Sequence, residues 1–477
     1  MPNIARQAGF ICLVATAGFS ILAARIRLPR SNVVVFIDSQ HTDSVKNILV
    51  LFDQEWDHAQ LRRAALLSGN ETRFFHEGFD LFSFPSNANL LFFNIFRFVD
   101  KLVEKYGGTR GGQKIDGIIS SHEQFGALSS ALLAQRLGLP STSVHGVMNA
   151  QHKALARTLI EREMPKANVA FATFPYTVRG ASEIALPFPF FAKPIKAAYS
   201  VLARRVEDFA DLKNHLTFQP WEKFIIKRLV RPFNDVVEHL GATDINGHYM
   251  LGEALIDGFQ VNVDGMVENG KITVLGIVDA VMYPGTDAFM RWEYPSKLPP
   301  EWQQNIHATT VGVVQALKFD HGLFNLELRI CTHSGDCKII EMNPRLAAQF
   351  SDMYEMVDGI NLHDIAIKLA TGESVNIEQL KANKNGQHRV ATSFVYRRFD
   401  GIPQPHFPGV AEVEKLRQYD PGAQLLLFKK RGNELKREMK WLQSYRYACL
   451  NIGGESAEHL LEKYRVASRI IGFPARG

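Results

Sequence analysis

The sequence has very little cysteine. The only cysteines among its 477 residues are Cys12, Cys331, Cys337 and Cys449. They form no CxxC pair and no cysteine–histidine spacing of the kind that binds structural zinc. Cys331 and Cys337 flank the segment THSGD and would face each other across a hairpin, but in a reducing compartment they remain thiols. The cysteines therefore predict neither a disulfide-stabilised fold nor a zinc module of that class.

The chain also lacks a strong excess of charge of one sign. Its formal net charge is +5, with 22% charged and 46% hydrophobic residues. This composition is typical of globular proteins with a large core, and the length suggests several domains. A mild positive charge suits anionic small molecules but does not indicate nucleic-acid binding. We therefore expect small-molecule substrates and no nucleic acid as partners, and the composition is compatible with a homodimer.

Long hydrophobic runs are absent except for one near the start. Residues 8–24 form an uncharged, mostly apolar run of 17 residues, whereas a membrane-spanning helix needs about 20. A signal peptide would carry a more basic leader than Arg6 alone. Three arginines follow the run, so insertion would keep the rest of the chain cytoplasmic. We expect a cytoplasmic protein in which residues 1–46 are an N-terminal extension, with membrane contact only through residues 8–24.

The region after this extension alternates short apolar strands with a helix. The run NILVLF ends just before Asp53, and DGIISS (116–121) again places a short apolar strand before polar residues. Residues 123–140 then show leucine and alanine at helical spacing, with a glycine and a proline at the end. This alternation predicts a parallel α/β domain over residues 47–150, and such sheets bind ligands at the carboxyl ends of their strands.

The middle of the chain is richer in strands. Residues 247–284 read as a meander of short strands with the turn ENGK. We expect a further strand at 188–194 and helices at 149–163, 299–319 and 361–372.

A polar stretch, KANKNGQ, begins at residue 381 and has the composition of a linker. It predicts a boundary between a domain over residues 151–380 and a small β-rich C-terminal domain over residues 381–477.

The segment KIIEMNPRLAAQF carries the strongest indication of chemistry. Glu341, Asn343 and Arg345 are spaced by twos at the end of an apolar strand, so their side chains share one face. Glu327 lies in the preceding strand and would lie beside Glu341 if the two strands pair. Two carboxylates and an amide are oxygen ligands, which suit Mg²⁺ rather than zinc. The alternative is that these side chains are simply exposed to solvent at a strand edge. That alternative does not explain why an amide and an arginine follow the acid at alternate positions.

Walker A and GxGxxG sequences are absent, so nucleotide binding would need another motif. The segments around EMNPR resemble the ATP-grasp superfamily, of the carboxylate–amine (amino-acid) ligase type with a biotin-carboxylase-like architecture. The similarity covers about residues 47–375 and keeps the family's order. Its blocks are DGIISSHEQFGALSSALLAQRLGLP, KALARTLIEREMP, PFPFFAKPIKAAYSVLARRV, LGEALIDGFQVNVDGMVENGKI and GLFNLELR with EMNPR. The resemblance implies a two-subdomain grasp fold, with a lid subdomain at about 165–250, between the N-terminal α/β domain and the C-terminal β-rich domain.

The resemblance also implies a role for individual residues. Glu327, Glu341 and Asn343 would hold Mg²⁺, with Mn²⁺ as an alternative, against the phosphates of ATP. The nucleotide would be contacted by Lys153, Lys193 and Glu253, the last on its adenine or ribose. Arg345 would stabilise an acyl-phosphate, and Arg291 would be a phosphate or carboxylate clamp. These roles fit the chemistry, because phosphoryl transfer depends on positioning and charge neutralisation.

Two parts of the sequence depart from the family's pattern. The phosphate-covering loop is usually rich in glycine, but here it contains Ala197 and Ala198. Ser200 remains the candidate phosphate contact of that loop. Gln260 stands where many members have glutamate, which leaves a ribose or substrate contact there open.

The expected activity is that of an ADP-forming ATP-grasp ligase that joins a carboxylate to an amine through an acyl-phosphate. A biotin carboxylase-like enzyme is the first alternative, although the continuation RLAAQF lacks the glutamate and histidine that serve bicarbonate in that family. The second alternative is a non-catalytic, ATP-binding regulatory protein, which the alanine-bearing loop keeps open.

Overall fold

The computed structural model describes most of the chain beyond the N-terminal extension. The described residues are 45–67, 72–81, 86–108, 113–197, 202–382, 386–399, 406–430, 432, 435–436, 438–439 and 443–476. The apolar run 8–24 and Ser200 lie outside them, so the predictions for both remain untested. No helix within these ranges is long and apolar enough to cross a membrane.

A parallel sheet of three strands forms the N-terminal part, as the sequence predicts. Its order is β2-β1-β3, and both pairings are parallel. Alternate residues of the central strand enter different cores: Leu49 and Leu51 pack toward α3 and α4, while Ile48 and Val50 pack toward α2 and α11. The elements are β1 (Lys46–Leu51), α2 (Glu55–Leu67), β2 (Thr72–Glu77), η1 (Ser86–Leu91), α3 (Ile95–Tyr106), β3 (Gly117–Ile119) and α4 (Gly126–Leu137).

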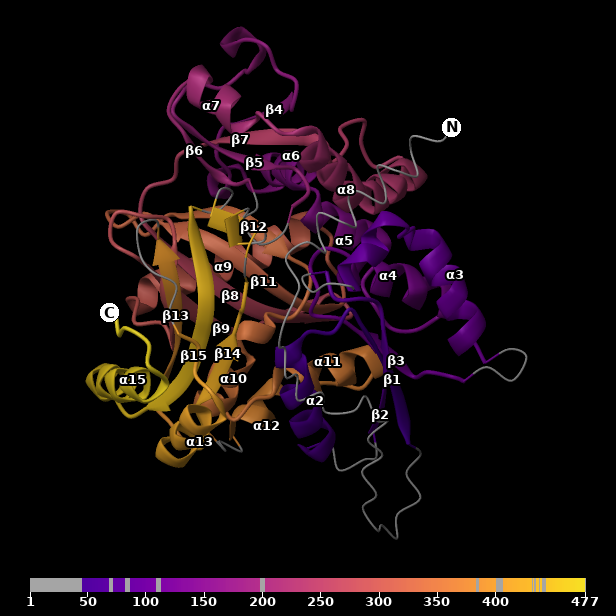
Figure 1. The fold of residues 1–477 in the computed structure, drawn as a ribbon. Coiled ribbons are helices and arrows are strands. Elements are labelled where there is room, and N and C mark those ends of the chain that lie inside the picture. Colours follow the sequence, from indigo (N-terminus) through magenta and orange to yellow (C-terminus); the bar gives the residue numbers. More distant parts are fainter. Residues whose placement is uncertain are drawn as a thin grey trace.

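An antiparallel sheet of eight strands is the largest element of the molecule (Figure 1). Its order is β12-β11-β8-β9-β10-β13-β15-β14. Helix α9 covers one face through an aliphatic core, and α10 covers the other through aromatic contacts. The strands are β8 (Phe259–Glu268), β9 (Lys271–Met282), β10 (Phe289–Tyr294), β11 (Gly322–Ile330), β12 (Cys337–Asn343), β13 (Val390–Phe399), β14 (Gln424–Leu427) and β15 (Ser444–Gly454). The helices around it are α9 (Pro300–Ala316), α10 (Ala348–Asp358), α11 (Leu362–Thr371), α12 (Ile377–Ala382), α13 (Val410–Tyr419) and α15 (Ala457–Ile471).

The C-terminal strands do not form a sheet of their own. β10 pairs with β13, so the three strands beyond residue 381 continue the same sheet. The boundary expected at 381 therefore falls between neighbouring strands of one sheet. Main-chain pairing between distant segments leaves little trace in local sequence, which explains the difference.

A four-stranded antiparallel sheet with the order β4-β7-β5-β6 lies beyond β12 in the predicted lid region (Figure 1). The long helix α8 comes from the same region but packs on the N-terminal part through Phe233, Val236 and Val237. The elements are η2 (Pro165–Ala167), β4 (Phe171–Pro175), η3 (Ala181–Glu183), β5 (Phe190–Pro194), β6 (Arg204–Val206), α7 (Phe209–His215), α8 (Pro220–Leu240) and β7 (Tyr249–Ala254).

The helix expected over 149–163 is two helices, α5 (Val144–Gln151) and α6 (Lys153–Glu163). His152 separates them with an extended backbone, and its Nδ1 accepts a hydrogen bond from the N–H of Leu155 at 3.1 Å. This side chain caps the second helix. The break places Lys153 at the first position of α6, where the chain enters the space between the sheets.

Candidate functional site

A pair of carboxylates lies on the edge hairpin formed by β11 and β12. Glu327 is in register with Glu341, and Asn325 is in register with Asn343. The register shifts between Glu327 and Leu328, which leaves Ile340 as an extra residue in the edge strand. Such a bulge re-aims neighbouring side chains and is frequent beside functional sites. The sequence-based pairing of the two glutamates is thus present in the structure.

The two carboxylates of this pair lie in different electrostatic surroundings. Burial, together with the charge of Glu341, raises the pKa of Glu327 to about 7. Burial would also raise the pKa of Glu341, but the ammonium groups of Lys153 and Lys193 outweigh it and hold that pKa below its ordinary value. Two partly buried carboxylates that repel each other form an arrangement that a divalent cation would relieve.

Amide groups complete the oxygen-rich corner. Gln260 Nε2 donates to Glu327 Oε2 at 2.8 Å, and Asn343 Nδ2 lies 3.5 Å from Glu327 Oε1. An amide at position 260 adds no third negative charge beside the pair. The donor set of Glu327, Glu341 and Asn343 fits a hard cation such as Mg²⁺, which binds carboxylate and amide oxygens.

Glu253 is the centre of a second buried cluster of charges. It is 4% exposed, and its two oxygens pair with Arg157 Nε at 2.7 Å and Lys193 Nζ at 2.9 Å. These cations outweigh the effect of burial and lower the pKa of Glu253. Both cations also donate to the bulged strand, Arg157 to the carbonyl of Ile339 at 2.8 Å and Lys193 to that of Ile340 at 3.1 Å. The cluster therefore fastens β5, β7 and α6 to the edge of the large sheet.

Lys153 lies between the carboxylate pair and the segment that follows β5. Its Nζ lies 3.3 Å from Glu341 Oε2 and donates to the carbonyl of Ala197 at 3.0 Å. It thus contacts both the carboxylate pair and the first alanine of the candidate phosphate-covering loop.

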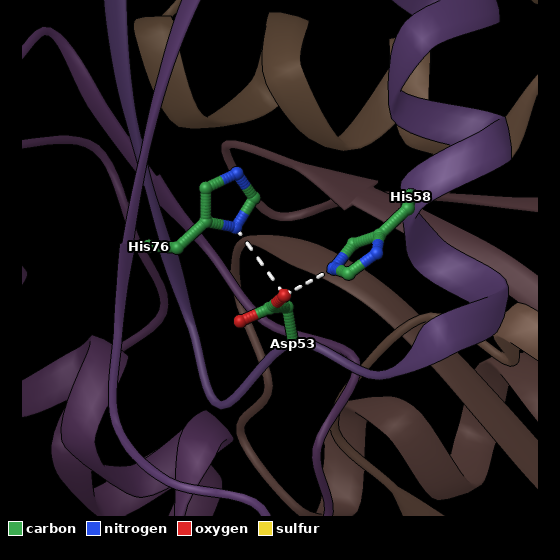
Figure 2. A group of neighbouring side chains, drawn as sticks. All are labelled: Asp53, His58 and His76. Atoms are coloured by element: carbon green, nitrogen blue, oxygen red, sulfur yellow. Dashed lines mark hydrogen bonds and ion pairs between the residues drawn. The ribbon is translucent and has the colours of Figure 1, made fainter. Parts of the chain in front are cut away.

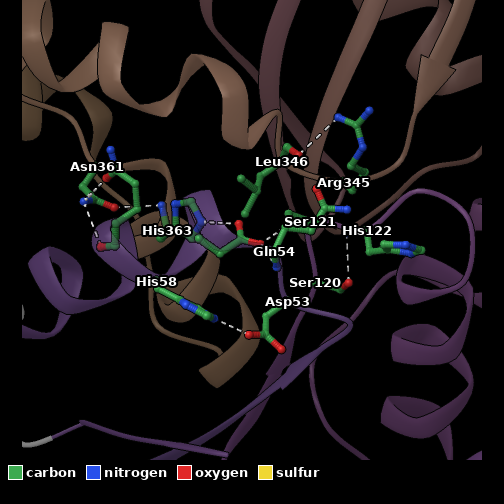
Figure 3. Close-up of polar contacts among 12 residues, drawn as sticks. Asp53, Gln54, His58, Ser120, Ser121, His122, Arg345, Leu346, Asn361 and His363 are labelled. Atoms are coloured by element: carbon green, nitrogen blue, oxygen red, sulfur yellow. Dashed lines mark hydrogen bonds and ion pairs between the residues drawn. The ribbon is translucent and has the colours of Figure 1, made fainter. Parts of the chain in front are cut away.

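A third group of charges belongs to the N-terminal part. Arg345 Nε lies 3.1 Å from Glu123 Oε2, and Lys196 Nζ lies 4.0 Å from Glu123 Oε1. Burial lowers the pKa of Lys196 to about 8, although Glu123 opposes this shift. Arg345 lies beyond the end of β12, and its Nη1 donates to the carbonyl of Leu346 at 3.2 Å (Figure 3). Three parts of the molecule thus contribute charges to one region.

A buried polar network joins the N-terminal sheet to α11 (Figure 3). Asp57 accepts from Ser121 Oγ at 2.6 Å and from His363 Nε2 at 2.9 Å. Asn361, which caps α11, also donates to Gln60 Oε1 at 2.8 Å. These hydrogen bonds tie Ser121, which follows β3, to α2 and α11.

Asp264 is a buried carboxyl group on the same sheet face as Glu327. It accepts from Asn325 Nδ2 at 2.9 Å and from the hydroxyl of Tyr354 at 3.0 Å. Burial raises its pKa to about 7.

Arg291 is not brought to this region. It lies in register with Phe394, whose ring stacks on Tyr464 of α15 at 3.9 Å. Its neighbour Trp292 points to the α10 side, where the carboxylate pair lies, so Arg291 faces the opposite side of the sheet. Arg291 Nε instead pairs with Glu293 at 2.6 Å. The placement gives the predicted clamp role no support.

Sequence reasoning overlooked Arg157, Lys196 and Glu123. Each had a modest indication: Arg157 follows Lys153 by four residues in a helix, Lys196 follows Lys193 by three, and Glu123 comes just after a short apolar strand. Spacing of this kind places side chains on one face of a helix or at one sheet end. It does not reveal that Arg157 would be buried against Glu253.

Comparison with known proteins adds a family and a fold. Residues 186–352 match the family model described as the ATP-grasp domain. No curated protein matches the chain in sequence. Solved structures match over most of the chain, at identities that establish likeness of fold alone.

Three such structures show the extent of the likeness. An L-amino acid ligase from Bacillus licheniformis is 16% identical with a TM-score of 0.64, over 90% of this chain and 99% of its own. A phosphoribosylglycinamide synthetase from Anaerococcus prevotii is 14% identical with a TM-score of 0.58, over 91% and 100%. A biotin carboxylase–β,γ-ATP complex from Campylobacter jejuni is 14% identical with a TM-score of 0.57, over 89% and 91%. The chain therefore shares the fold of these proteins, and the Glu327–Glu341 pair lies within the residues that match the ATP-grasp domain model.

Proposed function

We propose that the protein is an ATP-dependent carboxylate–amine ligase that releases ADP and phosphate. The observation that carries the proposal is the carboxylate pair Glu327–Glu341, with Lys153 at 3.3 Å and the Arg345–Glu123 pair nearby in the same region. Cations that surround a metal-binding carboxylate pair suit a polyanionic nucleotide. The ATP-grasp match over the same residues agrees with this interpretation.

Glu327, Glu341 and Asn343 would hold Mg²⁺, which supplies charge neutralisation at the nucleotide phosphates when it is bound. Lys153 and Lys193 are placed to bind phosphate oxygens as point charges. Glu253 holds Lys193 by an ion pair of 2.9 Å, so it would act through that lysine. This contact favours a positioning role for Glu253 over the predicted adenine or ribose contact.

The proposed reaction has two steps. An oxygen of the substrate carboxylate forms a bond to the γ-phosphorus of ATP, and ADP leaves. The amine nitrogen then forms a bond to the acyl carbon, phosphate leaves, and the nitrogen loses a proton to form the amide. Arg345 offers a planar fork of donors for the negative charge that develops on the acyl-phosphate. Release of Arg345 from Glu123 would accompany substrate binding.

An amino acid or a similar small acid is the proposed carboxylate substrate. The L-amino acid ligase shares the fold over nearly its whole length, which supports this class. A guanidinium also forms bidentate hydrogen bonds with a carboxylate. The proposed amine substrate is likewise a small molecule of about the size of an amino acid.

ADP release from the purified chain, with Mg-ATP and pools of small acids and amines, tests the proposal. The expected result is ADP release that needs one acid and one amine together, with the amide identified by mass spectrometry. ADP release that depends on bicarbonate and biotin would instead favour a carboxylase. Tight Mg-ATP binding without turnover in any pool would favour a regulatory nucleotide-binding protein.

A further inference from the structure

Two imidazoles and one carboxylate converge at the carboxyl end of the N-terminal sheet (Figure 2). His58 Nε2 and His76 Nδ1 both approach the same oxygen of Asp53, Oδ2, the latter at 3.3 Å. The three residues come from different elements. Asp53 follows β1, His58 lies in α2, and His76 lies in β2.

The donor set differs from that of the carboxylate pair. One ligand atom from each of the three side chains lies within 4.8 Å of the other two. Imidazole nitrogens with one carboxylate oxygen are the ligands that zinc and its neighbours in the first transition row prefer, whereas Mg²⁺ prefers oxygen alone. The chemistry therefore points to a borderline transition-metal ion.

One of the spacings fits such an ion. At zinc–ligand distances of about 2.0–2.1 Å, neighbouring ligand atoms of a tetrahedral site are roughly 3.3 Å apart. The distance between His76 Nδ1 and Asp53 Oδ2 is 3.3 Å. His58 Nε2 contacts the same oxygen directly, so this exposed imidazole would move away from the carboxylate when the ion binds.

Solvent reaches this cluster. The exposed fractions of the side chains are 22% for Asp53, 47% for His58 and 44% for His76. Three protein ligands with solvent access leave a fourth tetrahedral position for water or a small external ligand. The residues of the proposed ligase site do not take part in the cluster, so the two sites share no ligand.

We propose that Asp53, His58 and His76 bind a divalent transition-metal ion of the zinc type, with one coordination position open to solvent. The ion would fasten β2, one of the two outer strands of the sheet, to β1 and α2. This inference goes beyond the proposed ligase function and does not depend on it.

Cobalt binding to the full chain tests the site. Untagged protein is freed of metal with a chelator and titrated with Co²⁺ in the presence of excess Mg²⁺, which occupies the oxygen-rich site. We expect one equivalent of Co²⁺ to give the visible absorption of a tetrahedral ion, and one equivalent of Zn²⁺ to displace it. The same Zn²⁺ should raise the melting temperature of the wild-type protein.

Variants assign the ligands. His58→Gln and His76→Gln should each weaken Co²⁺ binding at least about 100-fold, because each removes one of only three protein ligands. Asp53→Asn, which keeps the side-chain shape, should do the same. His307→Gln, at an exposed position on α9, is the matched control and should bind like the wild type.

Metal-free melting curves show whether each variant is folded. The proposal is overturned if the wild type binds no Co²⁺ or Zn²⁺ under these conditions. It is equally overturned if binding persists with wild-type affinity in both histidine variants.

Discussion

The cluster around Glu253, beside the edge hairpin, and the cluster at the N-terminal sheet each gather charged side chains, but they do so in opposite ways. Glu253 and its partners Arg157 and Lys193 are almost fully buried, and each charge has an opposite charge within 3 Å. In the N-terminal cluster, His58 and His76 are nearly half exposed around one carboxylate. The first arrangement fixes side chains before a ligand arrives, while the second leaves ligand atoms accessible.

Burial explains why this difference matters. A buried charge that loses its partner cannot recover its hydration, so removal of one member of the pair is strongly destabilising. An exposed pair loses little, because water replaces the partner. Changes in the Glu253 cluster should therefore lower stability strongly, whereas changes in the N-terminal cluster should affect metal binding with little effect on stability.

The largest effect is expected at the carboxylate pair. Glu341→Ala should lower ATP turnover by about 10³-fold or more, since it removes a metal ligand and the partner of Lys153. Its circular dichroism spectrum should match that of the wild type. Glu301→Ala, at an exposed position on α9, serves as the control. Near-normal turnover of Glu341→Ala in an ADP-release assay would show that the metal assignment is wrong.

The buried ion pair comes next. Arg157→Met should lower the free energy of unfolding by about 3–5 kcal/mol, because it leaves the carboxylate of Glu253 with one cation instead of two. Glu253→Gln, which leaves both buried cations without their carboxylate, should lower the free energy of unfolding at least as much in urea unfolding.

The exposed pair Arg205–Glu207 provides the contrast to this buried pair. Arg205→Met should change the free energy of unfolding by less than about 1 kcal/mol. If Arg157→Met and Arg205→Met lowered the free energy of unfolding equally, burial would not decide how much these ion pairs stabilise the protein.

A smaller, pH-dependent effect is expected at Asp264. Its pKa in the folded protein is about 7, above the ordinary value of 3.8, so between these values the folded state keeps a proton that the unfolded state releases. The stabilisation by the neutral carboxyl group is complete below about pH 4 and is lost as the pH rises through 7.

Asp264→Asn cannot titrate and should therefore gain stability over the wild type as the pH rises. Between pH 5 and pH 8, the free energy of unfolding of the variant minus that of the wild type should increase by roughly 1–3 kcal/mol. Urea unfolding at several pH values measures this difference. A difference that does not vary with pH would show that the buried carboxyl group does not titrate in this range.

The smallest effect is expected in the N-terminal cluster. Without transition metal, His58→Gln should change the free energy of unfolding by less than about 1 kcal/mol, because the side chain is nearly half exposed. ATP turnover should stay at the wild-type level. A large loss of stability in metal-free buffer would contradict the view that this cluster is an accessible site rather than a structural ion pair.

Much of the fold followed from local patterns. The strands β11 and β12 and the pairing of Glu327 with Glu341 were predicted, because apolar runs and alternate polar residues report directly on strand faces. The break at His152 was missed, since a capping side chain inside a helical pattern is hard to recognise from spacing. The union of the C-terminal strands with the large sheet was also missed, because it depends on main-chain pairing between β10 and β13.

The residues of the candidate site also separate into those that the sequence predicted and one that it misplaced. Glu327, Glu341, Lys153 and Lys193 were predicted and lie together, whereas the predicted Arg291 faces the other side of the sheet. One residue of shift in a strand reverses the face of a side chain, so a site residue outside a recognised motif is easily misplaced.

The sequence by itself determined the strands of the edge hairpin, the spacing of its acid, amide and guanidinium groups, and the resemblance to an ATP-grasp domain. These features are local, since residues two apart in a strand share a face whatever the rest of the chain does. Only the tertiary structure decided that Arg157 and Lys193 would share Glu253, and that Asp53, His58 and His76 would meet at one carboxylate oxygen. Such contacts depend on the register and packing of separate elements, which the spacing of residues along the chain does not encode.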